Sequence, residues 1–384
     1  MREVWAKYLY AVIKLKHTYS IAVVLVAIAF ASCGGNHPQN SAQGDKIAIE
    51  SKELGPKRLR LLFAGDAMCH TPQIESARRQ DGSIDFRPSF AGVKPHFDQA
   101  DIAIVNLETT ISPNSRYTGY PCFSSPAEYT EALAWLGADV ALLANNHCCD
   151  NGAKGIRSTI AHLDSLSIAH TGVFHTEEEY KLNRILRLER NGIKLSLINY
   201  TYGTNGIPVP KGCMVNLIDT VRIADDIALA SKGADCVVAC MHWGNEYQRQ
   251  PSRQQRKLAQ FLHHHGVDIV IGSHPHVIQP YTTSEQQITI YSLGNFISNQ
   301  QYDHTDGGLL AEIEIEKAND TICKYSLRTI PIWVKKSPGH TLVSSDFAAE
   351  VEMSDAQRKR YERFISNTKQ LLNGCDNTQK DNTL

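Results

Sequence analysis

Short apolar runs alternate with helical stretches through most of this chain, and this alternation restricts the fold more than any other feature of the sequence. The apolar runs consist mainly of Val, Ile, Leu and Ala between polar residues, which is typical of strands covered on both faces. Strands are predicted at 59–65, 102–107, 140–144, 193–200, 236–243, 267–272 and 288–296. Helices are predicted at 126–136, 155–166, 219–231 and 252–265, and the last of them begins with a capping box of Ser252 and Gln255.

Strands that alternate with helices indicate an α/β fold with a largely parallel central sheet. The pattern changes after Gly308, where residues 309–317 (LLAEIEIEK) alternate strictly between apolar and polar and residues 323–334 follow as a second strand. These two segments predict antiparallel strands beside the core, and residues 354–372 predict a polar terminal helix. We therefore expect a main domain over residues 58–308, C-terminal strands and a helix packed on it over residues 309–372, and a disordered tail over residues 373–384.

The first 33 residues have the pattern of a secretory signal. A basic segment precedes the uncharged run from Ile21 to Ser32, and Cys33 follows directly. The run is shorter than the roughly 20 apolar residues that a membrane-spanning helix needs. A cysteine after Ala31 and Ser32 resembles a bacterial lipoprotein cleavage site, so we expect a signal peptide over residues 1–33 that ends at a lipidated Cys33. The alternative is an uncleaved anchor. Residues 34–57 are polar and predict a flexible tether. With a lipid on Cys33, we expect the domain in the bacterial cell envelope, anchored to a membrane and facing the periplasm or the exterior.

Charge and cysteine content exclude some classes of protein. The chain carries 39 Lys and Arg against 40 Asp and Glu, so no basic field points to nucleic acid. Nine cysteines remain beside Cys33, and none of them forms a C-x-x-C pair, which makes a zinc ribbon a weak interpretation. The spacing of these cysteines does not define a disulfide connectivity.

Polar clusters follow five of the predicted strands. Because ligands of open α/β sheets bind beyond the carboxyl ends of the strands, we expect these clusters to meet at one edge. A lone histidine or asparagine after a strand is more often structural, but five such clusters in series favour a binding site. The clusters are Gly65-Asp66, Asn106-Leu107-Glu108, Asn145-Asn146-His147, His242-Trp243-Gly244 and Gly272-Ser273-His274-Pro275-His276.

The side chains in these clusters are those of a transition metal site. Carboxylates, an amide oxygen and imidazoles together suit Mn, Fe or Zn, and two such divalent ions that share a bridging carboxylate activate a water molecule. We predict Asp66 and His276 on one ion, Asn146, His242 and His274 on the other, and Glu108 as the bridge. His147 is then the candidate general acid for a leaving group.

Further candidates lie close to these residues in the sequence. His70, Asn106 and Asn295 are candidates for an additional ligand or for support of a ligand. Loops on a rigid scaffold commonly bind substrate. The candidate substrate contacts are therefore Arg116, Tyr117 and Tyr120 in the loop over residues 112–125, and Glu246 and Tyr247 after His242.

The motif series resembles that of the CapA family, within the calcineurin-like metallophosphoesterases. The resemblance covers residues 59–308 and rests on GDAM (65–68), NLE (106–108), NNHCCDNG (145–152), MHWGNEY (241–247), GSHPHVIQP (272–280) and YSLGNF (291–296). It implies a four-layer α/β/β/α sandwich with a metal site at the carboxyl ends of the strands. It also implies a role in the synthesis, export or anchoring of capsule or poly-γ-glutamate. The implied partners are an anionic surface polymer or its precursor and the membrane proteins of capsule synthesis.

Two positions depart from the motifs of the wider group. Its first motif is D-x-H, whereas Met68 stands in the third place here, and its bridging aspartate is replaced by Asn106 and Glu108. The first hypothesis is a two-metal hydrolase that acts on a surface polymer. The alternatives are an assembly factor that binds polymer without hydrolysis, and an envelope phosphoesterase of nucleotides or polyphosphate.

Overall fold

A computed structural model describes residues 56–319 and 321–375 of the chain, and these residues fold around two β-sheets. The predicted signal peptide, Cys33 and most of the predicted tether and tail lie outside the described residues. Within the described part, no helix is long and apolar enough to cross a membrane.

The first sheet joins an antiparallel half to a parallel half at β1 (Lys57–Ala67). On one side of β1 lie the antiparallel strands β16 (Gly307–Ala318), β17 (Thr321–Lys335) and β18 (Thr341–Ser344). On the other side lie the parallel strands β2 (Ile102–Leu107), β5 (Val140–Leu142) and β6 (Ala169–Thr171). The alternating sequence of β16 predicted antiparallel pairing, and the structure confirms this prediction.

The second sheet has a parallel centre and two antiparallel edges. Its strands run in the order β13 (Tyr281–Thr283), β14 (Ile288–Ile290), β12 (Ile269–Ser273), β11 (Cys236–His242), β9 (Ile193–Thr201) and β8 (Leu186–Arg190). The periodicity alone predicted one largely parallel central sheet, and this is wrong. Alternating strands and helices indicate parallel pairing, but they do not specify how the strands divide between sheets.

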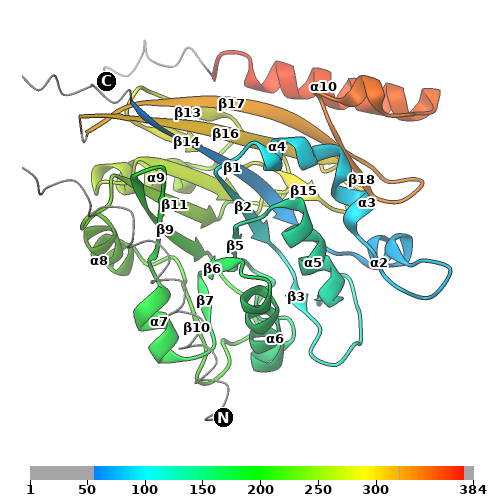
Figure 1. The fold of residues 1–384 in the computed structure, drawn as a ribbon, viewed down its shortest axis with the longest axis horizontal. Coiled ribbons are helices and arrows are strands. Elements are labelled where there is room, and N and C mark those ends of the chain that lie inside the picture. The colour runs from blue at the N-terminus through cyan, green and yellow to red at the C-terminus, as the bar shows by residue number, and fades with distance from the viewer. Residues whose placement is uncertain (1–55, 320, 376–384) are drawn as a thin grey trace, which may run out of the picture. The chain divides into compact units, whose positions relative to one another are not determined.

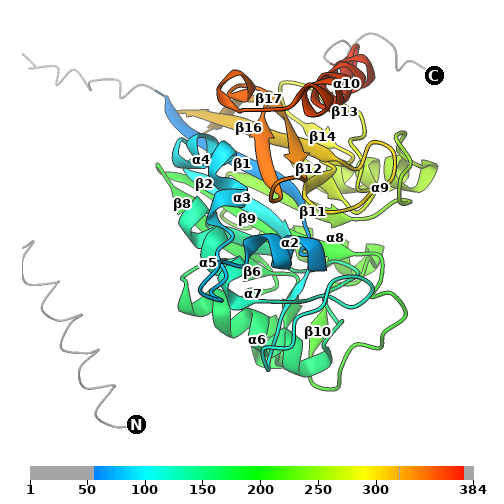
Figure 2. The ribbon, with the colours of Figure 1, turned by 90° about the vertical axis from the view of Figure 1, so that its right-hand side faces the viewer.

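The two sheets pack face to face between outer layers of helices (Figures 1 and 2). One apolar cluster fills the space between the sheets and includes Leu61 and Phe63 of β1 with Leu197 of β9 and Cys240 of β11. Side chains alternate along a strand, so Leu62 and Ala64 of β1 face the opposite way. The result is the four-layer α/β/β/α sandwich that the family resemblance implied.

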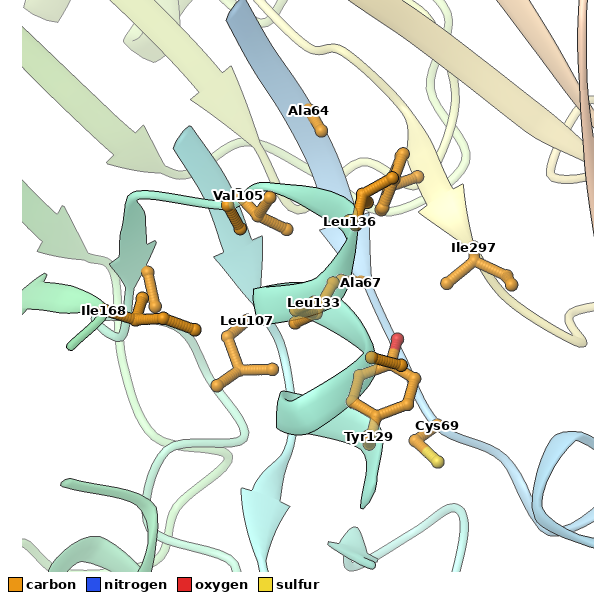
Figure 3. Packing of buried hydrophobic residues seen from close by; sticks show 14 of the residues in the cluster. Ala64, Ala67, Cys69, Val105, Leu107, Tyr129, Leu133, Leu136, Ile168 and Ile297 are labelled. Carbon is orange, nitrogen blue, oxygen red and sulfur yellow. The ribbon is translucent and has the colours of Figure 1, made fainter. Parts of the chain in front are cut away.

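Helices cover the outer face of each sheet. On the first sheet, α5 (Ala127–Leu136) packs Tyr129, Leu133 and Leu136 against β1 and β2 (Figure 3), beside α6 (Gly152–Ser165). On the second, α8 (Thr220–Ala230) and α9 (Arg253–His264) cover β9 and β11. The α9 capping box of Ser252 and Gln255 is present as predicted. The C-terminal helix α10 (Asp355–Leu372) lies along β17 of the first sheet (Figure 1).

The predicted strand at 288–296 is wrong, because this segment forms two strands in different sheets. Its first part is β14 of the second sheet, and its last part belongs to β15 (Asn295–Ile297), which pairs with the end of β1 in the first sheet. The chain turns at Gly294, which has a φ of 72°. A Cβ on Gly65 would lie 2.0 Å from the carbonyl oxygen of Gly294, so glycine allows the two segments to meet.

Several short elements had no sequence prediction. The connection from β1 to β2 contains α2 (Thr71–Ala77), α3 (Arg87–Phe90), the 3-10 turn η1 (Ala91–Val93) and α4 (Lys94–Asp98). The remaining ones are β3 (Thr110–Ile111), β4 (Ser124–Ser125), β7 (Val173–Phe174), α7 (Glu177–Asn183), β10 (Met214–Val215) and the 3-10 turn η2 (Ala348–Glu350), together with the sheet strands β6, β8, β13 and β18. Most of them are shorter than the window in which a periodic pattern can be recognised.

Candidate metal centre

The carboxyl ends of parallel strands from both sheets meet at one edge of the sandwich and carry the predicted ligands. Asp66 lies at the end of β1 and Glu108 directly follows β2, while His242 ends β11. The loops after β5 and β12 supply the others. All seven residues of the predicted core site are at most 3% exposed: Asp66, Glu108, Asn146, His147, His242, His274 and His276.

Glu108 lies at the centre of this cluster. It is fully buried, and neither carboxylate oxygen has a hydrogen-bond partner. Its Oε1 atom lies 3.6 Å from Nε2 of His242 and 3.8 Å from Nε2 of His276. Burial, and next the negative charge of Asp66, raise the pKa of Glu108 well above its usual value. A buried carboxylate without a partner is costly, so this position suits a bound cation.

Asp66, Glu108 and His276 form one candidate metal-binding group, with ligand atoms within 4.8 Å of one another. Nδ1 of His276 lies 3.0 Å from Oδ2 of Asp66. The backbone N–H of His274 also donates to Oδ2, at 3.2 Å. The same three residues that the sequence assigned to one ion, counting the bridge, are therefore adjacent in the fold. Their role as ligands stays a prediction.

Glu108, His242 and His274 form a second candidate group, which shares Glu108 with the first. Nε2 of His242 lies 2.8 Å from Oδ1 of Asn146, and Nδ1 of His274 is buried without a partner. Burial, and next the neighbouring histidines, lower the pKa of His242 well below its usual value and that of His274 to about 3. Both rings are therefore neutral at pH 7, the form in which imidazole binds a metal ion.

A third candidate group adds Glu246, which the sequence placed among the substrate contacts. Its carboxylate lies within 4.8 Å of ring nitrogens of both His274 and His276, although the residue is exposed. Glu246 is thus positioned for a ligand role as well as for contact with a substrate. The strand-end rule does not predict a ligand at Glu246, because this residue follows the end of β11 by four residues in a loop.

The three supporting candidates take different positions. Asn106 donates to Oδ1 of Asp66 at 2.8 Å, and Oδ1 of Asn295 lies 3.1 Å from Nδ1 of His276. Both asparagines therefore orient predicted ligands. His70 lies outside the three groups, and its Nδ1 atom accepts from the backbone N–H of Asn299 at 3.3 Å.

His147 pairs with an acid that the sequence analysis did not single out. Its Nδ1 atom lies 2.8 Å from Oδ2 of Asp150, whose side chain is fully buried. Since a carboxylate accepts, Nδ1–H donates, and this tautomer leaves Nε2 free to exchange a proton. The ring of Phe123 meets that of His147 edge-on at 4.7 Å and fixes its plane. The N-H-x-x-D spacing was the available signal for Asp150.

Exposed tyrosines surround the cluster. The ring of Tyr247 lies 6.2 Å from that of His276, and the ring of Tyr302 lies 4.5 Å from Tyr247. Tyr202, which follows β9, lies 4.5 Å from His274. Neither Tyr202 nor Tyr302 was predicted, although Tyr202 could have been found by the same strand-end rule.

The predicted contacts in the loop over residues 112–125 differ in position. Tyr120 is 73% exposed, and it contributes, after burial, Glu246 and Tyr302, to the raised pKa of Tyr247. Arg116 is exposed, whereas Tyr117 is half-buried and packs against the outer core of the first sheet. Tyr120 is therefore the best placed of the three for contact with a substrate.

Two face-to-face sheets between helical layers, with histidines and carboxylates at their strand ends, define an α/β/β/α sandwich protein with a candidate metal centre. The chain belongs to the family described as bacterial capsule synthesis protein PGA_cap, which matches residues 60–300. It is 26% identical over 307 residues to the PGA biosynthesis protein CapA of Bacillus subtilis (strain 168), covering 79% of this chain and 77% of that protein.

Another relative and a solved structure are also similar. The capsule biosynthesis protein CapA of Bacillus anthracis is 26% identical over 346 residues, which cover 86% of this chain and 80% of that protein. The crystal structure of a phosphatase from Mycoplasma pneumoniae superposes with a TM-score of 0.44 at 14% identity, covering 72% of this chain and 94% of that one.

Proposed function

We propose that this chain is an envelope lipoprotein with a two-metal hydrolase-like site that acts in the synthesis, export or anchoring of an anionic surface polymer such as poly-γ-glutamate. The polymer follows from family membership and from the names of the CapA relatives. The hydrolase-like site follows from Glu108, whose two unpartnered and fully buried oxygens lie between two groups of ligand side chains.

The side chains fit two divalent transition metal ions (Mn, Fe or Zn). Asp66, Glu108 and His276 would hold one ion, and Glu108, Asn146, His242 and His274 the other. Such a pair of ions, when bound, supplies Lewis acidity and lowers the pKa of bound water. The neutral rings of His242 and His274 and the unpaired carboxylate of Glu108 match that charge.

The remaining chemistry belongs to the protein's own groups. His147, held through Nδ1 by Asp150, is positioned to deliver a proton from Nε2 to a leaving group. Its ring is 4% exposed, so little water competes for that proton. Tyr120, Tyr202 and Tyr247 flank the cluster and would position the chain of the substrate.

One observation favours the non-hydrolytic alternative, an assembly factor that binds polymer at this site. Met68 occupies the position of the histidine in the D-x-H motif, and it is 1% exposed. A site without that histidine has one candidate ligand fewer. The pairing of His147 with Asp150 favours the enzyme, because polymer binding alone does not need an oriented buried imidazole.

Metal analysis of variants tests this proposal. We expect wild-type protein to contain two transition metal ions per chain, and Glu108→Gln, His242→Ala and His274→Ala each to lower that content. His263→Ala is the matched control, since this partly buried histidine bonds to Val267 and Thr289 away from the cluster. Wild-type protein is then assayed on phosphomonoesters, phosphodiesters, polyphosphate and γ-glutamyl amides. A protein with no transition metal would refute the two-metal site, and one with metal but no hydrolysis would favour the assembly factor.

A further inference from the structure

A cavity of about 370 Å³ is linked to the candidate metal centre through the neighbouring rings of Tyr302 and Tyr247. Its walls are the segment at residues 301–306, the end of β17 with the residues that follow it, and one face of α10. Gln357, Arg360, Phe364 and Asn367 of α10 line it at spacings of three and four residues, which places them on the same side of the helix. None of the functions discussed above uses this cavity.

Three cations line this cavity without a salt bridge to any described residue: Lys336, Arg360 and Arg363. Lys336 donates to the backbone carbonyl of Gln300. A fourth cation, Arg249, lies at the wall, where it donates to the backbone carbonyl of Asn367 at 3.0 Å. Its Nε atom is buried and has no partner. Unpaired cations gathered at a cavity favour an anionic ligand.

The lining also contains two acids. Oδ2 of Asp306 accepts from the indole N–H of Trp333 at 3.0 Å, and Asp303 is exposed. Cations therefore outnumber acids, but acceptors for N–H groups are present too. This mixture suits a chain that carries both carboxylates and amide N–H groups better than a chain of phosphates, which has acceptors only.

Tyr302 connects the cavity to the metal centre. It is 62% exposed, lines the cavity, and its ring lies 4.5 Å from that of Tyr247. Tyr247 in turn lies 6.2 Å from His276. A long substrate at the cluster can therefore extend across these two rings into the cavity.

We propose that this cavity is a binding subsite for the anionic polymer, and that it holds carboxylate and amide groups of the chain at a distance from the segment at the metal centre. This inference rests on the proposed function for the identity of the polymer. The basic face of α10 then adds affinity for long chains and does not take part in bond cleavage.

Binding of labelled poly-γ-glutamate to the protein, followed by fluorescence anisotropy, tests the subsite. We expect Arg360→Ala/Arg363→Ala to weaken binding about ten-fold at low salt, because each exposed ion pair contributes up to about 1 kcal/mol. The difference from wild type should shrink at high salt, where exposed charges are screened. Arg358→Ala/Lys359→Ala is the matched control, since it removes the same charge from exposed positions of α10 outside the cavity.

Equal loss in both double variants, or none in either, would overturn the subsite. Polyphosphate that binds as tightly as poly-γ-glutamate would overturn the proposed polymer class. Binding is measured without turnover, so one result can refute the subsite and a different result can refute the proposed hydrolase. Wild-type protein that binds the polymer through Arg360 and Arg363 but hydrolyses no substrate would refute the enzyme and support the subsite.

Discussion

Individual residues at the candidate metal centre divide into ligand candidates, residues that orient them, and one candidate proton donor. Glu108 belongs to two of the three candidate groups, and its buried, unpaired oxygens mark the place for positive charge. Asn106 and Asn295 orient Asp66 and His276. Among the described residues of the site, the buried ring of His147 has the shortest distance to a carboxylate, 2.8 Å to Asp150, and this pair makes the enzyme hypothesis testable at one residue.

Replacement of His147 by alanine should reduce turnover and leave the fold and the metal content intact. If Nε2 protonates the leaving group, turnover should fall by roughly 10²–10⁴. The loss should be smaller for a nitrophenyl ester, because nitrophenolate leaves without a proton. Steady-state kinetics on both substrate types measure the difference.

A second pair, of a buried histidine and an exposed aspartate, provides the control for this experiment. Nε2 of His170 lies 3.2 Å from Oδ1 of Asp164, at the C-terminal end of α6, and neither residue belongs to a candidate metal group. His170→Ala should therefore leave turnover close to wild type. Equal losses for alkyl and nitrophenyl substrates in His147→Ala would contradict the general acid role, since such a result points to a positional defect.

At the scale of helices and strands, most of the fold could be predicted because its elements carry their own signals. Ser252 and Gln255 cap α9 as predicted, and the strands with buried apolar runs occur close to their predicted bounds. The division of residues 288–296 between two sheets could not be predicted, since it depends on contact between Gly294 and Gly65, more than 200 residues apart. Tyr302 was missed for a similar reason, because its relation to the site is spatial, whereas the N-H-x-x-D spacing offered a local signal for Asp150.

The close contact between β1 and Gly294 predicts that a side chain added at Gly65 destabilises the fold. A methyl group there would lie 2.0 Å from the carbonyl oxygen of Gly294, next to the hydrogen bond from Asp66 N–H to that oxygen at 3.0 Å. Gly65→Ala should therefore lower the free energy of unfolding by about 1–3 kcal/mol, the usual cost of overpacking. It should also lower metal content, because Asp66 must shift. Chemical denaturation and metal analysis measure the two effects.

Gly203 offers a control at a glycine with free space. No atom lies within 4 Å of a Cβ placed there, so Gly203→Ala should change the free energy of unfolding by less than about 0.5 kcal/mol. If Gly65→Ala proves as mild as Gly203→Ala, the close approach of β1 and β15 does not limit this part of the fold.

At the scale of the whole molecule, the sandwich brings strand ends from both sheets to one edge. Asp66 and Glu108 come from the first sheet, and His242 and His274 from the second, so neither sheet alone completes the site. This arrangement explains why the polar clusters could be recognised in the sequence, whereas the four-layer sandwich that brings them together was implied only by the family resemblance. Strand-end position predicts a shared edge only once the strands are assigned to sheets.

The proposed lipid anchor would determine the location of the whole molecule in the cell, and substitution of Cys33 tests this proposal. The uncharged run from Ile21 to Ser32 leads directly into Cys33, as at a lipoprotein cleavage site. Acyl chains on that cysteine would contribute about 0.8 kcal/mol for each buried methylene, enough for stable attachment when more than one chain is present. Cys33→Ala should therefore move the protein from the membrane fraction to the soluble fraction of cells, as detected by immunoblotting. Cys122→Ala removes an exposed thiol of the folded domain and should leave the distribution unchanged. If the Cys33→Ala protein still sediments with membranes, the apolar run itself is the anchor and the site is attached without lipid.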